Sequence, residues 1–192
     1  DRWGNVVSAT PSANVFRDES NGGQSGVTYG NRLCSLNTTS GHPNCIQAGK
    51  RPRITLTPTL VLKNGSPILA ISVAGGDLQD QATMNLLLDF IEFQMLPEAA
   101  VTAPRFATAH HQDSFDPNPN RTQVFKQAGS LTISGDTDLS VQQELSIRGH
   151  QLEVKSSPIA SPVMLYIDQG SGTLYAAGDP EAGRHVAGLG KK

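Results

Sequence analysis

The 192-residue sequence contains little of what marks several common protein classes. It has two cysteines and neither a CxxC nor an HExxH motif, which argues against a disulfide framework and against a common zinc site. No apolar run approaches the roughly 18–20 residues that cross a bilayer. A net charge of -2 gives no electrostatic basis for binding nucleic acid or an anionic membrane. We therefore expect no metal, no nucleic-acid partner and no membrane span.

Other familiar site motifs are missing as well. There is no GxGxxG dinucleotide fingerprint and no GxSxG nucleophile elbow, so we expect no cofactor and no Ser/His/Asp triad within this chain. Cys34 and Cys45 are expected to be two free thiols or one isolated bridge. The N-terminus has neither an initiator Met nor the apolar core of a signal peptide, and we expect a processed or incomplete polypeptide.

The first half of the chain divides into a long polar region and a hairpin. Residues 5–10 are rich in β-branched side chains and predict a strand. Residues 17–53 are rich in Gly, Ser and Asn, and because such long loops are usually functional we expect this region near the active-site cleft. Residues 59–63 and 66–74 are β-rich runs joined by Asn-Gly, which predicts a hairpin. The second run is apolar on both faces, as in the middle of a covered sheet.

A long amphipathic helix is predicted after the hairpin. Asp77 is a suitable N-cap, and Asp80 in the first turn favours the helix dipole. The apolar side chains at helical spacing predict one buried face made of Met84, Leu87, Leu88, Ile91 and Met95. The expected solvent face carries Asn85, Asp89 and Glu92, and Pro97 marks the end of the helix.

The second half of the chain alternates helices with short strands. Residues 97–104 predict a short helix, and residues 137–149 predict another, capped by Thr137 or Asp136 and stopped by Gly149. Three strands are expected at residues 150–155, 163–168 and 173–178. The pattern predicts an α+β fold, with an antiparallel sheet covered by helices, in one domain over residues 1–192.

Two short stretches stand out as candidate functional elements. Gly75-Gly76 lies where the buried strand passes directly into the helix, at a conformational cost of roughly 0.5–1 kcal/mol per glycine relative to alanine. Either the turn needs backbone angles that only glycine tolerates, or another group approaches the backbone closely. The stretch GKRPRIT concentrates Lys50, Arg51 and Arg53, and is either a solvated basic loop or a carboxylate-binding corner.

Several pieces of the sequence together resemble the small subunit of the γ-glutamyltransferase family of N-terminal nucleophile hydrolases. The pieces are DRWGNVVSATPSAN (1–14), GKRPRITLTPTLV (49–61), AGGDLQ (74–79), EAAVTAPRF (98–106) and LYAAGDP (174–180). They occur in family order and with family spacing, and they span nearly the whole chain. The resemblance implies an αββα sandwich of antiparallel sheets covered by helices.

The resemblance also implies a mechanism. A precursor cleaves itself and frees a Thr at the start of the small subunit; its hydroxyl attacks a γ-glutamyl amide with its own α-amine as base. That Thr is expected a few residues before Asp1, so the chain as given holds no nucleophile. In the family the Gly-Gly pair supplies backbone N–H groups for the oxyanion, which assigns this role to Gly75 and Gly76 here.

Other family residues carry over one at a time. Ser12 lies where a second Thr hydrogen-bonds the nucleophile, and Asn14 matches an asparagine that contacts the glutamyl group. Thr55 matches the second of two substrate-binding serines, whereas Ile54 replaces the first. Arg32 stands for a Gln or Glu, and Ser35 stands for the Asp that holds the substrate α-ammonium. These changes predict an acyl group that lacks the α-amine or carries a carboxylate there, because Arg32 would repel an ammonium.

Three functional interpretations follow from the resemblance. The first is a γ-glutamyltransferase-like hydrolase or acyltransferase of glutathione metabolism, paired with a large subunit from the same autocleaved precursor. The second is an acylase acting on glutaryl or related dicarboxylic side chains, and the third is a non-catalytic homologue with a binding or structural role. The resemblance favours a periplasmic or secreted protein and leaves a cytoplasmic location open.

Overall fold

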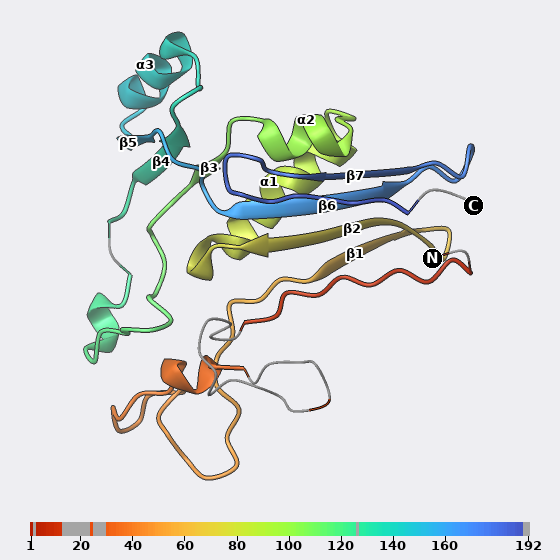
Figure 1. Cartoon of the computed structure of the whole chain (residues 1–192). Helices are drawn as coiled ribbons and strands as arrows, with labels where there is room; N and C mark the ends of the chain where they lie inside the picture. The colour runs from red at the N-terminus through yellow and green to blue at the C-terminus, as the bar shows by residue number, and fades with distance from the viewer. Residues whose placement is uncertain (2, 13–23, 25–29, 126, 190–192) are drawn as a thin grey trace.

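The fold was analysed in a computed structural model of the whole chain, shown in Figure 1. The structure describes residues 1, 3–12, 24, 30–125 and 127–189. In chain order its elements are η3 (Arg32–Ser35), β1 (Thr59–Lys63), β2 (Ser66–Ala74), η4 (Gly76–Leu78), α1 (Gln79–Ile91), α2 (Pro97–Thr102), β3 (Phe106–Ala107), η5 (Arg121–Gln123), β4 (Ser130–Ser134), α3 (Leu139–Ile147), β5 (Gln151–Lys155), β6 (Ser161–Ile167) and β7 (Leu174–Gly178), where η marks a 3-10 helix.

The main sheet has four antiparallel strands in the order β1-β2-β6-β7. The predicted hairpin is confirmed, because β1 pairs with β2 through a turn at Asn64 (φ 53°) and Gly65 (φ 80°). Positive φ at both central residues is the geometry of the two-residue turns that match strand twist. The interior place predicted for the second run is confirmed as well, since β2 lies between β1 and β6.

Helices α1 and α2 lie against one face of this sheet (Figure 1). Alternate residues of β2 point towards the helices, as the two-residue period of a strand requires. The buried hydrophobic core between these layers consists of Leu69, Ile71, Val73, Ala82, Leu86, Ala100, Val101, Met164 and Ala177. Burial of these side chains is the main force that holds α1 in place above the strand that precedes it.

The buried face predicted for α1 is wrong. Met84 and Ile91 are 56% and 54% exposed, and Leu88 is exposed too, whereas Ala82 and Leu86 contact the sheet. Several faces of this helix carry enough apolar side chains to fit a 3.6-residue period, and packing against β2 selects between them. Asn85, expected in solvent, is buried and its side-chain amide donates to the carbonyl of Gln81 at 2.7 Å.

The ends of α1 also differ from the prediction. The helix begins at Gln79 after the short helix η4, and it ends at Ile91, six residues before the proline expected to stop it. Pro97 instead occupies the first turn of α2, where its missing N–H costs nothing. The short helix predicted at residues 97–104 is therefore confirmed.

A second, three-stranded sheet has the order β3-β4-β5. Strands β4 and β5 are parallel, with α3 forming the crossover, which corrects the expectation of antiparallel pairing throughout. Neither β3 nor β4 was predicted, since both are short and lie next to polar loops. Helix α3 follows Asp138 rather than Thr137 or Asp136, and the stop at Gly149 agrees with its φ of 92°.

The N-terminal segment runs alongside the main sheet without becoming one of its strands, so the strand predicted at residues 5–10 is wrong. Side-chain hydroxyls make the contacts that a backbone ladder would make. Ser8 Oγ donates to the carbonyl of Ile71 at 2.6 Å, and Ser72 Oγ donates to the carbonyl of Ala9 at 2.9 Å. Hydroxyls that reach the main chain compete with regular pairing in this way.

One buried ion pair joins the two sheets. The guanidinium of Arg105, just before β3, pairs with the carboxylate of Asp179, just after β7, and both side chains are almost completely buried. Arg105 Nε also donates to the carbonyl of Ile159 at 3.0 Å, on the segment between β5 and β6. The expectation of a single domain over residues 1–192 stays a prediction. Within the described residues, no helix has the length and apolar character of a bilayer span.

Candidate active site

The Gly75-Gly76 turn needs glycine at each position for a different reason. An alanine Cβ at Gly75 would lie 2.8 Å from Ala160 Cβ, closer than real Cβ contacts, so the approach of the β5–β6 connection requires the missing side chain. Gly76 has φ 60°, and nothing lies within 4 Å of the place where its Cβ would be. It is therefore glycine because of backbone conformation rather than space.

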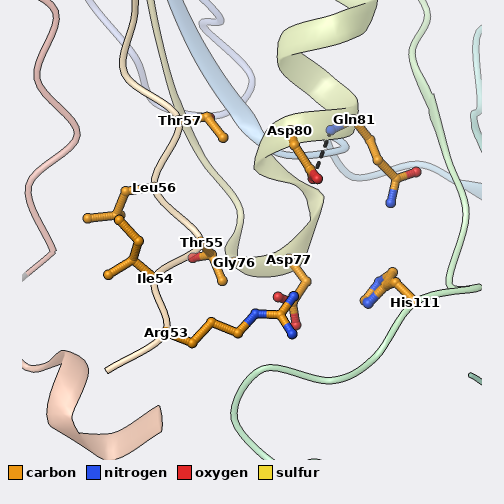
Figure 2. A pocket seen from close by; sticks show the side chains of 10 residues that line it. All are labelled: Arg53, Ile54, Thr55, Leu56, Thr57, Gly76, Asp77, Asp80, Gln81 and His111. Atoms are coloured by element: carbon orange, nitrogen blue, oxygen red, sulfur yellow. Dashed lines mark hydrogen bonds between the residues drawn. The ribbon is translucent and has the colours of Figure 1, made fainter. Parts of the chain in front are cut away.

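The two backbone N–H groups of this turn face no acceptor. Among the described residues, neither the Gly75 nor the Gly76 N–H donates a hydrogen bond. They lie at the start of the η4–α1 helical segment, where unpaired N–H groups and the helix dipole favour negative charge. Gly76 lines a cleft of about 170 Å³, together with Arg53, Thr55, Asp77, Gln81 and His111 (Figure 2).

Helix α1 holds one wall of this cleft in place. The buried Gln79 can donate through its amide to the carbonyls of Thr55 at 3.1 Å and Val73 at 2.8 Å. One turn later, Thr83 Oγ1 lies 3.1 Å from Thr57 Oγ1. These contacts attach the loop that carries Thr55 to the helix that follows the Gly-Gly turn, so the two sides of the cleft keep a constant spacing.

Asp77 does not cap the helix as predicted. Its carboxylate accepts from the backbone N–H of Ser114 at 2.9 Å and from the Ser114 hydroxyl, and α1 has no side-chain cap. Because η4 separates Asp77 from α1, the carboxylate points away from the helix and binds the loop before β4 instead. Sequence analysis missed Ser114 because a contact across 37 residues leaves no local pattern.

A buried histidine lies beyond Arg53. His42 is 8% exposed, and its Nδ1 accepts from the backbone N–H of Asn44 at 2.9 Å. The pKa of His42 is held below its usual value by burial and then by the positive charges of Arg121, Lys50 and Arg53. The imidazole is therefore neutral near pH 7, with its proton on Nε2.

We expect the unfolding free energy of the protein to fall as the pH drops below about 6.5, the ordinary pKa of histidine. Because the folded pKa of His42 is lower than that value, the unfolded chain binds more protons in this window and gains stability relative to the folded chain. Urea unfolding at several pH values should give a flatter profile for His42→Gln than for the wild type. The exposed His150→Gln variant is the control, and an unchanged slope in His42→Gln would contradict the assignment.

The match to a known family decides the identity of this fold. The model of the family described as Gamma-glutamyltranspeptidase matches residues 1–189. The chain belongs to the gamma-glutamyltranspeptidase family. The architecture is accordingly the α+β fold of the N-terminal nucleophile hydrolases, and the resemblance drawn from the five sequence pieces is confirmed.

Relatives of the gamma-glutamyltranspeptidase family include proenzymes of two named kinds. The chain is 26% identical over 193 residues to the "Glutathione hydrolase proenzyme" of Bacillus subtilis strain 168, covering all of this chain and 30% of that protein. It is 26% identical over 178 residues to the "Acylase ACY 1 proenzyme" of Pseudomonas sp. strain V22, covering 92% of this chain and 28% of the relative. The chain thus spans about a third or less of these curated relatives.

A solved structure of the family shares the fold over nearly its full length. The gamma-glutamyltranspeptidase T380A mutant of Helicobacter pylori superimposes with a TM-score of 0.70 at 25% identity, covering 94% of this chain and 96% of that one. The cephalosporin acylase of Bacillus halodurans gives a TM-score of 0.65 at 25% identity, covering 81% of this chain and 26% of that one.

Two residues assigned through gamma-glutamyltranspeptidases lie around the cleft. Gly76 and Thr55 both line it. Ser12 lies near its entrance loop, where its carbonyl accepts from the Asn31 N–H at 3.3 Å and its hydroxyl lies 3.4 Å from Asn31 Oδ1. Asn14 lies outside the described residues. The roles of these residues in the family mechanism stay predictions.

Ser35, expected to face the substrate, is placed differently. Its side chain is 2% exposed, and its hydroxyl lies 2.8 Å from the carbonyls of both Arg32 and Arg53. Ser35 therefore holds the main chains of two arginines together. The guanidinium of Arg32 lies over the ring of Phe115 at 5.2 Å, and its Nε is buried without a hydrogen-bond partner among the described residues.

Proposed function

We propose that the whole protein is an amide hydrolase or acyltransferase that forms an acyl-enzyme on an N-terminal Thr located upstream of Asp1. The observation that carries this proposal is the pair of unbonded N–H groups at Gly75 and Gly76, beside a cleft and at the start of a helical segment. Such donors stabilise the oxyanion that develops when a nucleophile attacks an amide carbonyl.

The turn at the N-terminus indicates where that nucleophile would lie. The Asp1 amine donates to the Asn5 carbonyl at 2.9 Å, and the Asn5 N–H donates to Asp1 Oδ1 at 3.0 Å, so the chain reverses here. Any segment before Asp1 would run antiparallel to residues 5–12. Each step upstream of Asp1 pairs with one step beyond Asn5, which puts the seventh residue upstream opposite Ser12.

The same segment leads towards the oxyanion donors. Ser8 contacts Ile71, and Thr10 Oγ1 lies 3.0 Å from Ser72 Oγ, so the segment advances along β2 in the direction of Gly75. A Thr opposite Ser12 would therefore lie at the end of β2 that carries the Gly-Gly turn. Its α-amine would accept the hydroxyl proton and pass it to the leaving amine, and water or an acceptor amine would then release the acyl group.

The rest of the precursor is proposed to supply a large subunit. The face of the main sheet opposite α1 and α2 is apolar, and no helix or strand of the described chain packs over it. Leu60 and Leu174 on this face are 45% and 60% exposed, and Val163 and Leu165 are half-buried between them. A second sheet packed there would complete an αββα sandwich, in keeping with relatives about three times as long.

The acyl group is proposed to carry a carboxylate where a γ-glutamyl group carries its ammonium. Ser35 offers no carboxylate for an ammonium, and it holds Arg32 and Arg53 together instead. This favours glutaryl-type amides, as expected for the acylase interpretation, over unmodified γ-glutamyl amides. The similarity to the acylase and cephalosporin acylase relatives supports this second candidate within one mechanism.

The test uses the protein expressed from its complete gene. We expect two chains on a denaturing gel, the smaller beginning with a Thr seven residues upstream of Asp1 by intact mass. Glutaryl-p-nitroanilide should be hydrolysed faster than γ-glutamyl-p-nitroanilide, since the arginines attract a carboxylate and repel an ammonium. A protein that stays one chain and hydrolyses neither substrate is the non-catalytic homologue, and the proposal is then wrong.

A further inference from the structure

A second hollow adjoins the cleft on the far side of Arg53. Its volume is about 170 Å³, and the lining residues that matter are His42, Asn44, Arg53, Gln112, Ser114 and Arg121. Arg53 lines both cavities, and Ser114 is the residue that binds Asp77 of the cleft. The two cavities are therefore neighbours that share one guanidinium.

The hollow has an excess of positive charge. Arg53 and Arg121 line it, and Lys50 is near enough for its charge to act on His42. Within the part of the chain that the structure describes, none of these three cations forms an ion pair with a carboxylate. The nearby Asp113 carboxylate accepts from the N–H groups of Phe115 and Asp116, so one of its oxygens is bound to its own loop.

The hollow also has more hydrogen-bond donors than acceptors. Asn44 N–H occupies the lone pair of His42 Nδ1, which leaves the imidazole proton on Nε2. That nitrogen lies 3.1 Å from Arg121 NH1, and the side-chain amide of Gln112 lies at the same distance. A guanidinium cannot accept a hydrogen bond, so two donors face each other across one edge of the hollow. A carboxylate, with two acceptor oxygens and a negative charge, would satisfy both.

We propose that this hollow is a carboxylate subsite, in which Arg53 and Arg121 bind an acidic group of the amide substrate while the scissile bond lies in the adjoining cleft. Its assignment to a substrate depends on the proposed function, whereas carboxylate binding itself does not. Arginine forks suit planar carboxylates, and Arg53 is positioned to join the two cavities.

The binding test compares glutarate with butyrate by calorimetry on the protein expressed from its complete gene. We expect glutarate to bind the wild type at least about tenfold more tightly, and Arg121→Gln to lose about tenfold to a hundredfold of glutarate affinity. Arg148→Gln, on α3 and paired with Glu144, is the matched control and should bind like the wild type. Equal glutarate affinity in wild type and Arg121→Gln would overturn the subsite, as would tighter binding of inorganic phosphate than of glutarate.

A kinetic readout separates the subsite from the proposed function. With glutaryl- and butyryl-p-nitroanilide, Arg121→Gln should raise KM for the glutaryl substrate and leave the butyryl reaction unchanged. If the wild type hydrolyses neither substrate, the proposed function fails, and the glutarate binding data still decide the subsite. If hydrolysis occurs and Arg121→Gln leaves the preference for glutaryl unchanged, the subsite is overturned and the proposed function stands.

Discussion

Replacing Gly75 with alanine is expected to lower kcat for amide hydrolysis about 100- to 1000-fold. The new Cβ would lie 2.8 Å from Ala160 Cβ, so the turn must shift and carry the Gly75 and Gly76 N–H groups away from the oxyanion. Loss of one such donor typically raises the barrier by about 2.7–4 kcal/mol. The measurement is steady-state kinetics on the glutaryl anilide, with KM expected to change far less than kcat.

The neighbouring residue offers a rescue. Ala160 itself has φ 62°, a conformation that suits glycine, so Ala160→Gly should fold at least as well as the wild type. The double variant Gly75→Ala/Ala160→Gly removes the closest contact and should recover part of the lost kcat. Full activity in Gly75→Ala alone, or no recovery in the double variant, would contradict the explanation by a steric shift of the donors.

Replacing Asp179 with alanine should produce the largest loss of stability, about 3–5 kcal/mol in the unfolding free energy. The change leaves the guanidinium of Arg105 buried without its carboxylate, at the junction of the two sheets. Asp179 Oδ1 also accepts from the N–H groups of Glu181 and Ala182 at 3.0 and 3.2 Å, so the turn after β7 loses its support as well. Equilibrium urea unfolding measures the effect.

An exposed ion pair provides the matched control for Asp179→Ala. Glu144 and Arg148 pair at 3.0 Å on α3, with side chains 55% and 66% exposed, and Glu144→Ala should cost at most about 1 kcal/mol. If Asp179→Ala fails to fold, Asp179→Asn keeps an oxygen acceptor and should remain measurable at a smaller cost. A loss in Asp179→Ala no larger than in Glu144→Ala would refute the role given to the buried pair.

Local patterns predicted the parts of the fold that depend on local chemistry. The Asn-Gly turn specified the hairpin because few other dipeptides adopt positive φ twice in succession. The cost of Gly75 and Gly76 drew attention to a turn that proves to need one glycine for space and one for conformation. In both cases the physical cause lies within a few residues, or leaves a residue type that few other causes explain.

Features that depend on distant contacts could not be predicted in this way. The choice of buried face on α1 depends on how Leu86 fits against β2, which a helical period alone does not encode. Asp77 is a good N-cap by its residue type, and only the position of Ser114 shows that its carboxylate is used elsewhere. The burial of Ser35 between two carbonyls likewise depends on where Arg53 lies in space.

The uncovered apolar face of the main sheet bears on the order of events during biogenesis. Released alone, this chain would present Leu60, Leu174 and their neighbours to water and to other copies, a hazard typical of large apolar surfaces. While the precursor is still one polypeptide, the tether keeps the missing layer at a high effective concentration. Cleavage before the proposed N-terminal Thr is therefore expected to follow docking of the two parts, so that folding quality is checked before the nucleophile is freed.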